Sequence, residues 1–351
     1  MNDSENNGRA QRRAVAHLYH TLFTGLILTV VTRRNATDAA AWIGALFRKQ
    51  HHSKFLSSFE KLGLNNLPPA VAAAAYHYLS NRIGGVDVEF MRESDRKAWV
   101  RFPPPRWIYP GATICGVPSE VSRAMLRGWY AENGRSLGVP GLQFVCTGQT
   151  MDTQSGLMGY FIEHDEPLAD EERLIFRPGE IAPPFDPEQA PALPRGEWPA
   201  ERLENARRNY AMEYHRTGIP LLFSMFGVAE AHHLLRTACW LVGTQTSREI
   251  AEMLGETNQD EAALIRIVGN LIEGEGDRVE TESSESGTIL TRIGLGPLRG
   301  TMPQPPEAIE AWAALYEGIA SGHNRFIRQR LLHYHGEKTI WEINPMLIPV
   351  N

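Results

Sequence analysis

The sequence predicts an α+β protein made of two tandem repeats. Three observations lead to this prediction: an order of helices and hairpins that is written twice, a proline-rich stretch between the two copies, and a globular composition that is 42% hydrophobic and 22% charged. At 351 residues the chain is also long for a single hydrophobic core, so two domains are the better expectation.

The first repeated element is a helix. The stretch RRAVAHLYH at residues 12–20 recurs as RRNYAMEYH at residues 207–215, with a constant offset of 195. In both copies arginine, alanine and tyrosine are spaced i, i+4 and i+7, so they share one helical face. The apolar run at residues 22–31 continues this repeated helix and is therefore interpreted as part of the fold. Its length is below the roughly 20 residues that a membrane-spanning helix needs.

The elements that follow recur in the same order. Each half has a helix ending near a glycine, a helix with an asparagine near its end, a strand–turn–strand, a helix containing tyrosine and a closing hairpin. In the first half they cover residues 54–64, 72–85, 86–102, 119–134 and 142–164, and in the second half 247–256, 262–276, 277–293, 306–322 and 324–344. Such a duplication predicts two α+β units with antiparallel hairpins, which we expect to pack as a pseudo-dimer about an internal two-fold axis.

These patterns also predict the domain boundaries. Residues 1–10 are polar and are expected to be a disordered tail. Residues 11–166 form the first repeat and residues 201–351 the second. Between them, residues 167–200 contain eight prolines, which is typical of an extended and stiff linker.

Charge and cysteine content exclude several classes of protein. The net charge of −6 gives no electrostatic reason to expect nucleic acid or a membrane surface as a partner. Residues 246–280 loosely resemble a helix-turn-helix, but the second helix carries Asp260 and Glu261 with only Arg266 to contact DNA. Three distant cysteines cannot form a disulfide framework, so a reducing, cytoplasmic location is expected.

Two stretches resemble a known family. The helical opening LLFSMFGVAEAHHLLRTACWLVGTQTSREIAEMLG and the later YAENGRSLGVPGLQFVCTGQT…GYFIEH are similar to L-2-amino-thiazoline-4-carboxylic acid hydrolase-like proteins, relatives of the 4-vinyl-reductase ligand-binding fold. The resemblance implies a small-molecule pocket and hydrolysis of a cyclic C–N bond, and some members of the fold only bind ligands. Many family members carry a cysteine in the last strand, where this chain has GYFIEH and TIWEIN.

Five residues are candidates for catalysis. The pairs Tyr19–His20 and Tyr214–His215 recur in both halves, as a general base with its hydrogen-bonding companion would. The alternative is structural: the tyrosine hydroxyl and the histidine nitrogen form hydrogen bonds to buried polar groups. Cys115 precedes a helix expected to start at Ser119, where a thiol can have a lowered pKa and act as a nucleophile, although an inert thiol is the alternative.

Four further residues are candidates for substrate binding. His232 and His233 lie in a helix at a helix–helix contact or a pocket rim. They do not form a metal site with Cys239, because seven helical residues separate His232 from Cys239 by about 10.5 Å along the axis. Glu163 and His164 end the first repeat and can supply acid–base groups or lie in a charged surface turn.

The stretch HYH is the candidate metal site. On a strand His333 and His335 project to one face, and a turn at Gly336–Glu337 would return Glu342 to that face. Two histidines and a carboxylate are a ligand set for zinc or iron. The alternative is a solvated or partner-facing hairpin.

The sequence therefore predicts a small-molecule enzyme, a hydrolase acting on a cyclic C–N or aromatic compound. The competing prediction is a non-catalytic small-molecule sensor or interaction protein. An enzyme should gather titratable groups in one pocket, whereas a sensor should show a mostly apolar cavity. A homo-oligomer is compatible with both.

Overall fold

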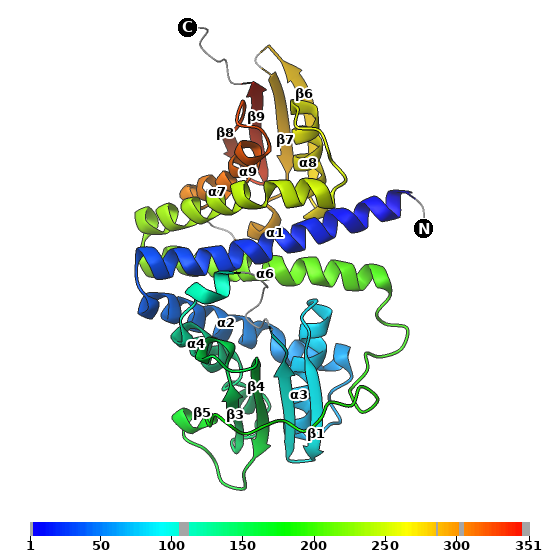
Figure 1. The fold of residues 1–351 in the computed structure, drawn as a ribbon, viewed down its shortest axis with the longest axis vertical. Coiled ribbons are helices and arrows are strands. Elements are labelled where there is room, and N and C mark those ends of the chain that lie inside the picture. Colours follow the sequence, from blue (N-terminus) through cyan, green and yellow to red (C-terminus); the bar gives the residue numbers. More distant parts are fainter. Residues whose placement is uncertain (1–2, 105–111, 286, 302–304, 346–351) are drawn as a thin grey trace. The chain divides into compact units, whose positions relative to one another are not determined.

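The computed structural model describes residues 3–104, 112–285, 287–301 and 305–345, and within them the protein is α+β, as predicted. Two compact units are present. The inserted unit is residues 30–203, and the split unit combines residues 1–29 with residues 204–351. Figure 1 shows the helices and strands of both.

The main helices and strands follow one another in the order expected from the sequence, with β5 as an addition. The helices are α1 (Asp3–Arg33), α2 (Ala36–Leu62), α3 (Pro69–Ile83), α4 (Ser119–Trp129), α5 (Asn133–Ser136), α6 (Ala200–Phe226), α7 (Val228–Met253), α8 (Glu261–Gly274) and α9 (Pro306–His323). The strands are β1 (Glu89–Ser94), β2 (Lys97–Phe102), β3 (Leu142–Gly148), β4 (Leu157–Glu163), β5 (Leu174–Phe176), β6 (Arg278–Ser284), β7 (Gly287–Ile293), β8 (Ile327–His335) and β9 (Lys338–Pro345).

The inserted unit packs helices against one face of a five-stranded sheet with the order β1-β2-β4-β3-β5. Its helix α2 begins where the side chain of Asn35 accepts a hydrogen bond from the backbone N–H of Asp38 at 2.8 Å, and ends at Gly63, whose φ of +71° suits glycine. Helix α4 lies close against α2, and glycine at position 128 permits this approach. A Cβ on Gly128 would come within 2.5 Å of the Gly44 carbonyl oxygen.

The predicted linker covers the other face of that sheet. Residues Met91, Trp99, Val145 and Tyr160 form an apolar cluster there, which Ala182 completes and against which Phe185 packs. The linker prediction was wrong at its start, since Leu174–Phe176 is strand β5 and pairs in parallel with β3. The apolar outer face of the sheet accounts for the packing of Ala182 and Phe185, because burying apolar surface stabilises the folded chain.

The split unit has a four-stranded antiparallel sheet with the order β6-β7-β9-β8, covered on one face by α8 and α9 (Figure 1). Helix α9 packs tightly on α7 through three glycines, Gly243, Gly318 and Gly322. A Cβ at any of them would come within 2.2–2.5 Å of a backbone carbonyl oxygen of the opposite helix. Leu290, Trp341 and Ile343 face the helices and are fully buried.

Apart from α5 and β5, which only the first half has among the described residues, the order of elements is the same in both halves of the sequence, but the compact units do not follow the halves. The part of α1 up to Thr29 belongs with the second half. Residues 3–10, predicted as a disordered tail, are the first turns of α1, because the apolar helix simply extends toward the N-terminus. Packing about an internal two-fold axis remains a prediction.

Helix α1 is the one helix in the described part of the chain that is long and apolar enough to cross a membrane. Of its most apolar window, 67% is buried inside the protein, as in a core helix. This is weak evidence for a membrane span, and it is compatible with the interpretation of residues 22–31 as part of the fold.

Candidate anion-binding pocket

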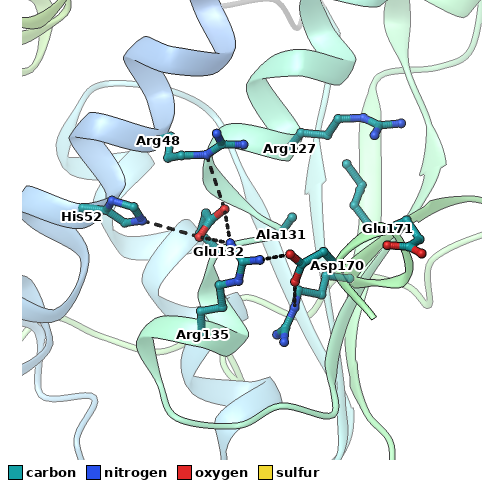
Figure 2. Close-up of a pocket in the computed structure, with 10 residues that line it drawn as sticks. Arg48, His52, Arg127, Ala131, Glu132, Arg135, Asp170 and Glu171 are labelled. Carbon is teal, nitrogen blue, oxygen red and sulfur yellow. Dashed lines mark hydrogen bonds and ion pairs between the residues drawn. The ribbon is translucent and has the colours of Figure 1, made fainter. Parts of the chain in front are cut away.

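A polar pocket lies in the inserted unit, where α2, the connection between α4 and α5, and the short helix η3 (Asp170–Arg173) meet (Figure 2). Its volume is about 330 Å³. The lining residues are Arg48, His52, Arg127, Ala131, Glu132, Arg135, Asp170, Glu171, Arg173 and Leu174. Eight of these ten side chains are ionisable, so the pocket suits a charged ligand rather than an apolar one.

Regular elements position these side chains. Arg48 and His52 lie one turn apart on the same face of α2. Arg127 lies in the last turn of α4, where a cation interacts favourably with the carbonyl end of the helix dipole. Arg135 projects from α5, so each basic group has a helical anchor.

Glu132 is the centre of the pocket's ion-pair network. The residue is only 4% exposed, yet three basic side chains reach its carboxylate. Arg48 Nε lies 3.5 Å from Oε1, His52 Nε2 lies 3.5 Å from Oε2, and Arg135 Nη1 donates to both oxygens at 3.3 Å. Since a buried carboxylate is stable only when paired, Glu132 holds these three groups together.

Asp170 continues the network toward η3. It pairs with Arg135 and, at 3.3 Å, accepts a hydrogen bond from Arg173 Nε (Figure 2). The hydrogen bond from Arg135 holds the pKa of Asp170 below its usual value, and Asp170 in turn raises the pKa of Arg135. Both groups are therefore charged at neutral pH.

Two guanidinium groups keep hydrogen-bonding capacity. Arg127 is exposed and has no acidic partner among the described residues. Arg173 has a side chain only 12% exposed, and its buried Nη1 has no hydrogen-bond partner in the described part of the protein. Because four arginines face three carboxylates, the pocket has a positive surplus. Guanidinium groups bind carboxylates and phosphates by paired hydrogen bonds.

A shallower hollow adjoins this pocket along α2. It is lined by Ala45, Arg48, Lys49, His52 and Ser53, so it shares Arg48 and His52 with the pocket. Lys49 adds another positive charge beside them. The basic surface therefore extends beyond the pocket along one face of α2.

The repeated tyrosine–histidine pairs lie elsewhere, in the core of the split unit. Tyr19 packs on the ring of His215 and His20 on the ring of Tyr214, so the two copies of the motif contact each other crosswise. His215 Nε2 donates to the Tyr19 carbonyl oxygen at 2.7 Å, and Tyr19 Oη donates to Glu275 at 3.0 Å. These contacts agree with the structural interpretation of the pairs.

Burial also affects how these groups titrate. It raises the pKa of Tyr19 well above its usual value and lowers the pKa of His215 to about 4. All four residues of the two pairs are at most 5% exposed. Neither of the two pockets described above is lined by any of them.

The other predicted residues are dispersed. Cys115 is exposed in η1 (Ala112–Gly116), and three residues separate it from Ser119, the first residue of α4. His232 is half-buried and His233 exposed on α7. Glu163 ends β4, and the exposed His164 contacts Gln143 at 3.1 Å. None of these residues lines the pocket.

The predicted metal site does not assemble. The hairpin is as expected, with β8 and β9 joined at Gly336–Glu337 and His333, His335 and Glu342 on one face. However, Glu342 pairs with Arg330 at 2.9 Å, and no group of three or more potential ligands lies together among the described residues. A bulge at Leu331–His333 interrupts the register, and His333 lies opposite Ile340, two positions along β9 from Glu342.

Sequence reasoning missed a buried ion cluster in the split unit. Arg292 on β7 is fully buried and donates to Asp277 at 2.8 Å and to the Tyr316 hydroxyl oxygen at 2.8 Å. It also pairs with Glu275. Burial acts to lower the pKa of Arg292, but Glu275 and the other partners outweigh it and raise that pKa. The signal was present in the sequence, since Arg292 shares a strand face with the apolar Leu290.

The inserted unit has a neutral counterpart between its third helix and its sheet. His77 of α3 stacks between Tyr130 and Phe161, with ring centroids 3.9 and 5.4 Å away, and contacts Asn133 at 3.0 Å. Burial lowers its pKa well below the usual value. This histidine is therefore an uncharged core residue.

No protein-family model, no curated protein and no solved structure matches this chain.

Proposed function

We propose that the protein binds a small anionic compound, a carboxylate or a phosphate ester, in the pocket of the inserted unit. The observation that carries this proposal is the pair of guanidinium groups with spare donors, Arg127 and Arg173, in a pocket whose Glu132 and Asp170 are already paired. A bound anion would accept the hydrogen bonds that these donors lack.

The shape of the pocket supports a small ligand. Figure 2 shows Arg127 and Glu171 on the side of the pocket away from His52, with Glu132 and Arg135 between them. A volume of about 330 Å³ lies at the lower end of the range for small-molecule sites. The polar lining argues against the mostly apolar cavity that a sensor of hydrophobic compounds would have.

Binding is tested by isothermal titration with inorganic phosphate and with succinate. We expect Arg127→Gln and Arg173→Gln each to weaken binding by about 10-fold or more, since hydrogen bonds to charged groups contribute about 1.5–3 kcal/mol. Arg123→Gln is the matched control, because it removes the same charge from α4 outside the pocket. Absence of binding by both anions, or equal loss in all three variants, would refute the proposal.

The hydrolase that the resemblance implies is the second candidate, favoured by His52. Its imidazole is 57% exposed and lies 3.5 Å from the buried Glu132, an arrangement suited to a general base with an orienting carboxylate. Release of ammonia or of a ring-opened product from a cyclic amidine would be followed by mass spectrometry. If wild-type protein shows turnover that His52→Gln loses while anion binding persists, the pocket is catalytic. Binding without turnover assigns it a binding role alone.

A further inference from the structure

The arginine pairs of the repeated motif come together in the split unit. The motif places Arg12 and Arg13 on α1 and Arg207 and Arg208 on α6. The tyrosine–histidine pairs of the same two motifs contact each other, so the helices lie side by side there. The arginines meet as well, since Glu204 lies 3.8 Å from both Arg13 Nη2 and Arg207 Nη1. The duplication therefore gathers basic groups from both copies at one place.

One carboxylate does not neutralise this group of arginines. Glu204 is buried, and Arg9 Nε also donates to it at 3.3 Å, so three guanidinium groups share it. Arg12 and Arg208 form no ion pair with an acidic side chain among the described residues. The Nε atom of Arg12 is buried and makes no hydrogen bond in the part of the protein that the structure describes. Two positive charges thus remain without a direct counter-charge.

Arg208 and Arg299 both bind the turn between α8 and β6. Arg208 Nη1 donates to the carbonyl oxygen of Gly274 at 3.1 Å, and Arg299 Nη2 donates to that of Gly276 at 3.0 Å. A Cβ on Gly276 would lie 3.5 Å from the same Arg208 nitrogen, so both guanidinium groups border this glycine. Arg299 also pairs with Asp277, but the arginine of the buried ion cluster shares that carboxylate.

Helix α1 adds Arg12 at this turn. The preceding residue packs on it closely, since a Cβ on Gly274 would come within 2.8 Å of the Gln11 carbonyl oxygen. Burial lowers the pKa of Arg208, and the charges of Arg12 and Arg299 lower it further, against the opposite effect of the two carboxylates of the buried ion cluster. Because arginine stays protonated at neutral pH, the positive charge of Arg208 is destabilised where it lies.

We propose that Arg12, Arg208 and Arg299 form a binding site for a phosphorylated small molecule, one that carries a phosphate monoester or a pyrophosphate group. Such a group has about two negative charges at neutral pH and accepts the paired hydrogen bonds that guanidinium groups donate. A ligand with this charge offsets the repulsion among the three arginines. The side chain of Arg299 is 46% exposed, so the site is open to solvent. It is separate from the pocket of the inserted unit, because all three arginines belong to the split unit.

Isothermal titration with inorganic pyrophosphate tests this proposal. The proteins compared all carry Arg127→Gln and Arg173→Gln, which remove the spare donors of the other pocket and make the result independent of that site. We expect this background protein to bind one pyrophosphate, more weakly as salt is raised. Arg12→Gln or Arg208→Gln added to it should raise the dissociation constant about 10-fold or more.

Arg248→Gln is the matched control. It removes the same charge from an exposed ion pair on α7 and should change the affinity by less than about 2-fold. Circular dichroism checks the fold of Arg208→Gln, which loses a donor to the Gly274 carbonyl. Arg12 makes no hydrogen bond of this kind among the described residues, so Arg12→Gln gives an independent measurement.

Vesicles distinguish a soluble ligand from a lipid headgroup that carries the same phosphate group. The background protein is sedimented with phosphatidylcholine vesicles that contain phosphatidic acid. Sedimentation that Arg12→Gln and Arg208→Gln abolish would assign the phosphate to a lipid. Binding of pyrophosphate without binding of vesicles would assign it to a soluble compound.

Two results would overturn the proposal. The first is a background protein that binds neither pyrophosphate nor the vesicles. The second is a loss of affinity in Arg248→Gln that equals the loss in Arg12→Gln and Arg208→Gln, because general electrostatic attraction would then account for the binding.

Discussion

The two units bury different chemistry between their helices and their sheet. The split unit buries an arginine with two carboxylates there, around Arg292. The inserted unit buries the neutral His77 among aromatic rings. One order of elements therefore tolerates either a charged or an uncharged interior. In each case the buried ionisable side chain, Arg292 or His77, has hydrogen-bond partners.

The difference has a consequence for stability. A buried arginine and its carboxylates are stable only together, because the desolvation of any one of these charges is unfavourable without its partner. A buried histidine can instead lose its proton and remain neutral. The interiors should therefore respond to different perturbations, the inserted unit to acid and the split unit to removal of one partner.

Acid should produce the largest effect and should act first on the inserted unit. Burial lowers the pKa of His51 to about 3, and that of His77 well below its usual value. Since the unfolded chain binds these protons near pH 6.5, stability is full above that pH and falls as the pH drops toward the folded pKa. His51 alone represents about 4–5 kcal/mol at the end of that range, at about 1.4 kcal/mol per pKa unit. The split unit, with His215 at about 4, should lose about 3 kcal/mol.

Hydrogen exchange read by mass spectrometry at pH 7 and pH 4.5, corrected for intrinsic rates, separates the two units. We expect residues 30–203 to lose protection first. In a variant with His51→Gln and His77→Gln that difference should shrink, because neither glutamine titrates. Earlier loss of protection in the split unit would contradict this comparison.

Arg292→Met should be the next largest effect. It leaves Glu275 buried without a cation, which costs about 3–5 kcal/mol, whereas Asp277 keeps its ion pair with Arg299. Urea unfolding followed by circular dichroism measures this loss. Arg101→Met is the control on the corresponding strand β2, where the half-exposed ion pair with Glu89 should contribute below about 1 kcal/mol. Adding Glu275→Gln to Arg292→Met should recover part of the loss, and no recovery would argue against an electrostatic cause.

The glycine contacts between helices give the smallest effects and test packing rather than charge. In Gly243→Ala the added Cβ would lie 2.2 Å from the Leu315 carbonyl oxygen, so α7 and α9 must separate at a cost of about 1–3 kcal/mol. Gly44→Ala meets nothing closer than 3.7 Å and should stabilise α2 by about 0.5–1 kcal/mol. Thermal unfolding measures the change. We expect Gly243→Ala to lower the melting temperature and Gly44→Ala to raise it, and Gly128→Ala, at a second tight position, to lower it as well.

Local patterns in the sequence predicted much of the fold. The closing hairpin of the second half has its turn at Gly336–Glu337 because that turn chemistry is local. The duplicated order of elements was readable because each element has its own periodicity. By contrast, the grouping of α1 with the second half depends on contacts between residues about 200 or more positions apart, such as Tyr19 with Glu275.

The pocket was not predicted, for a related reason. Its basic and acidic residues come from α2, the α4–α5 connection and η3, and each alone reads as an ordinary charged surface residue. Only Glu132, buried although it follows the amphipathic helix α4, departs from that pattern. For the tyrosine–histidine pairs the sequence suggested a reactive site. In the structure the repeated pairs contact each other in the core.

The interruption of the split unit by the inserted unit has a consequence for synthesis. Residues 30–203 are complete soon after they leave the ribosome, whereas α1 must wait for partners as far along the chain as Trp312 of α9. At about 5–20 residues per second, the roughly 300 intervening residues take roughly 15–60 s to be made. Until α9 emerges, the apolar residues of α1 are translated but lack part of their native contacts. We therefore expect nascent neighbours or a chaperone to shield α1 until α9 emerges.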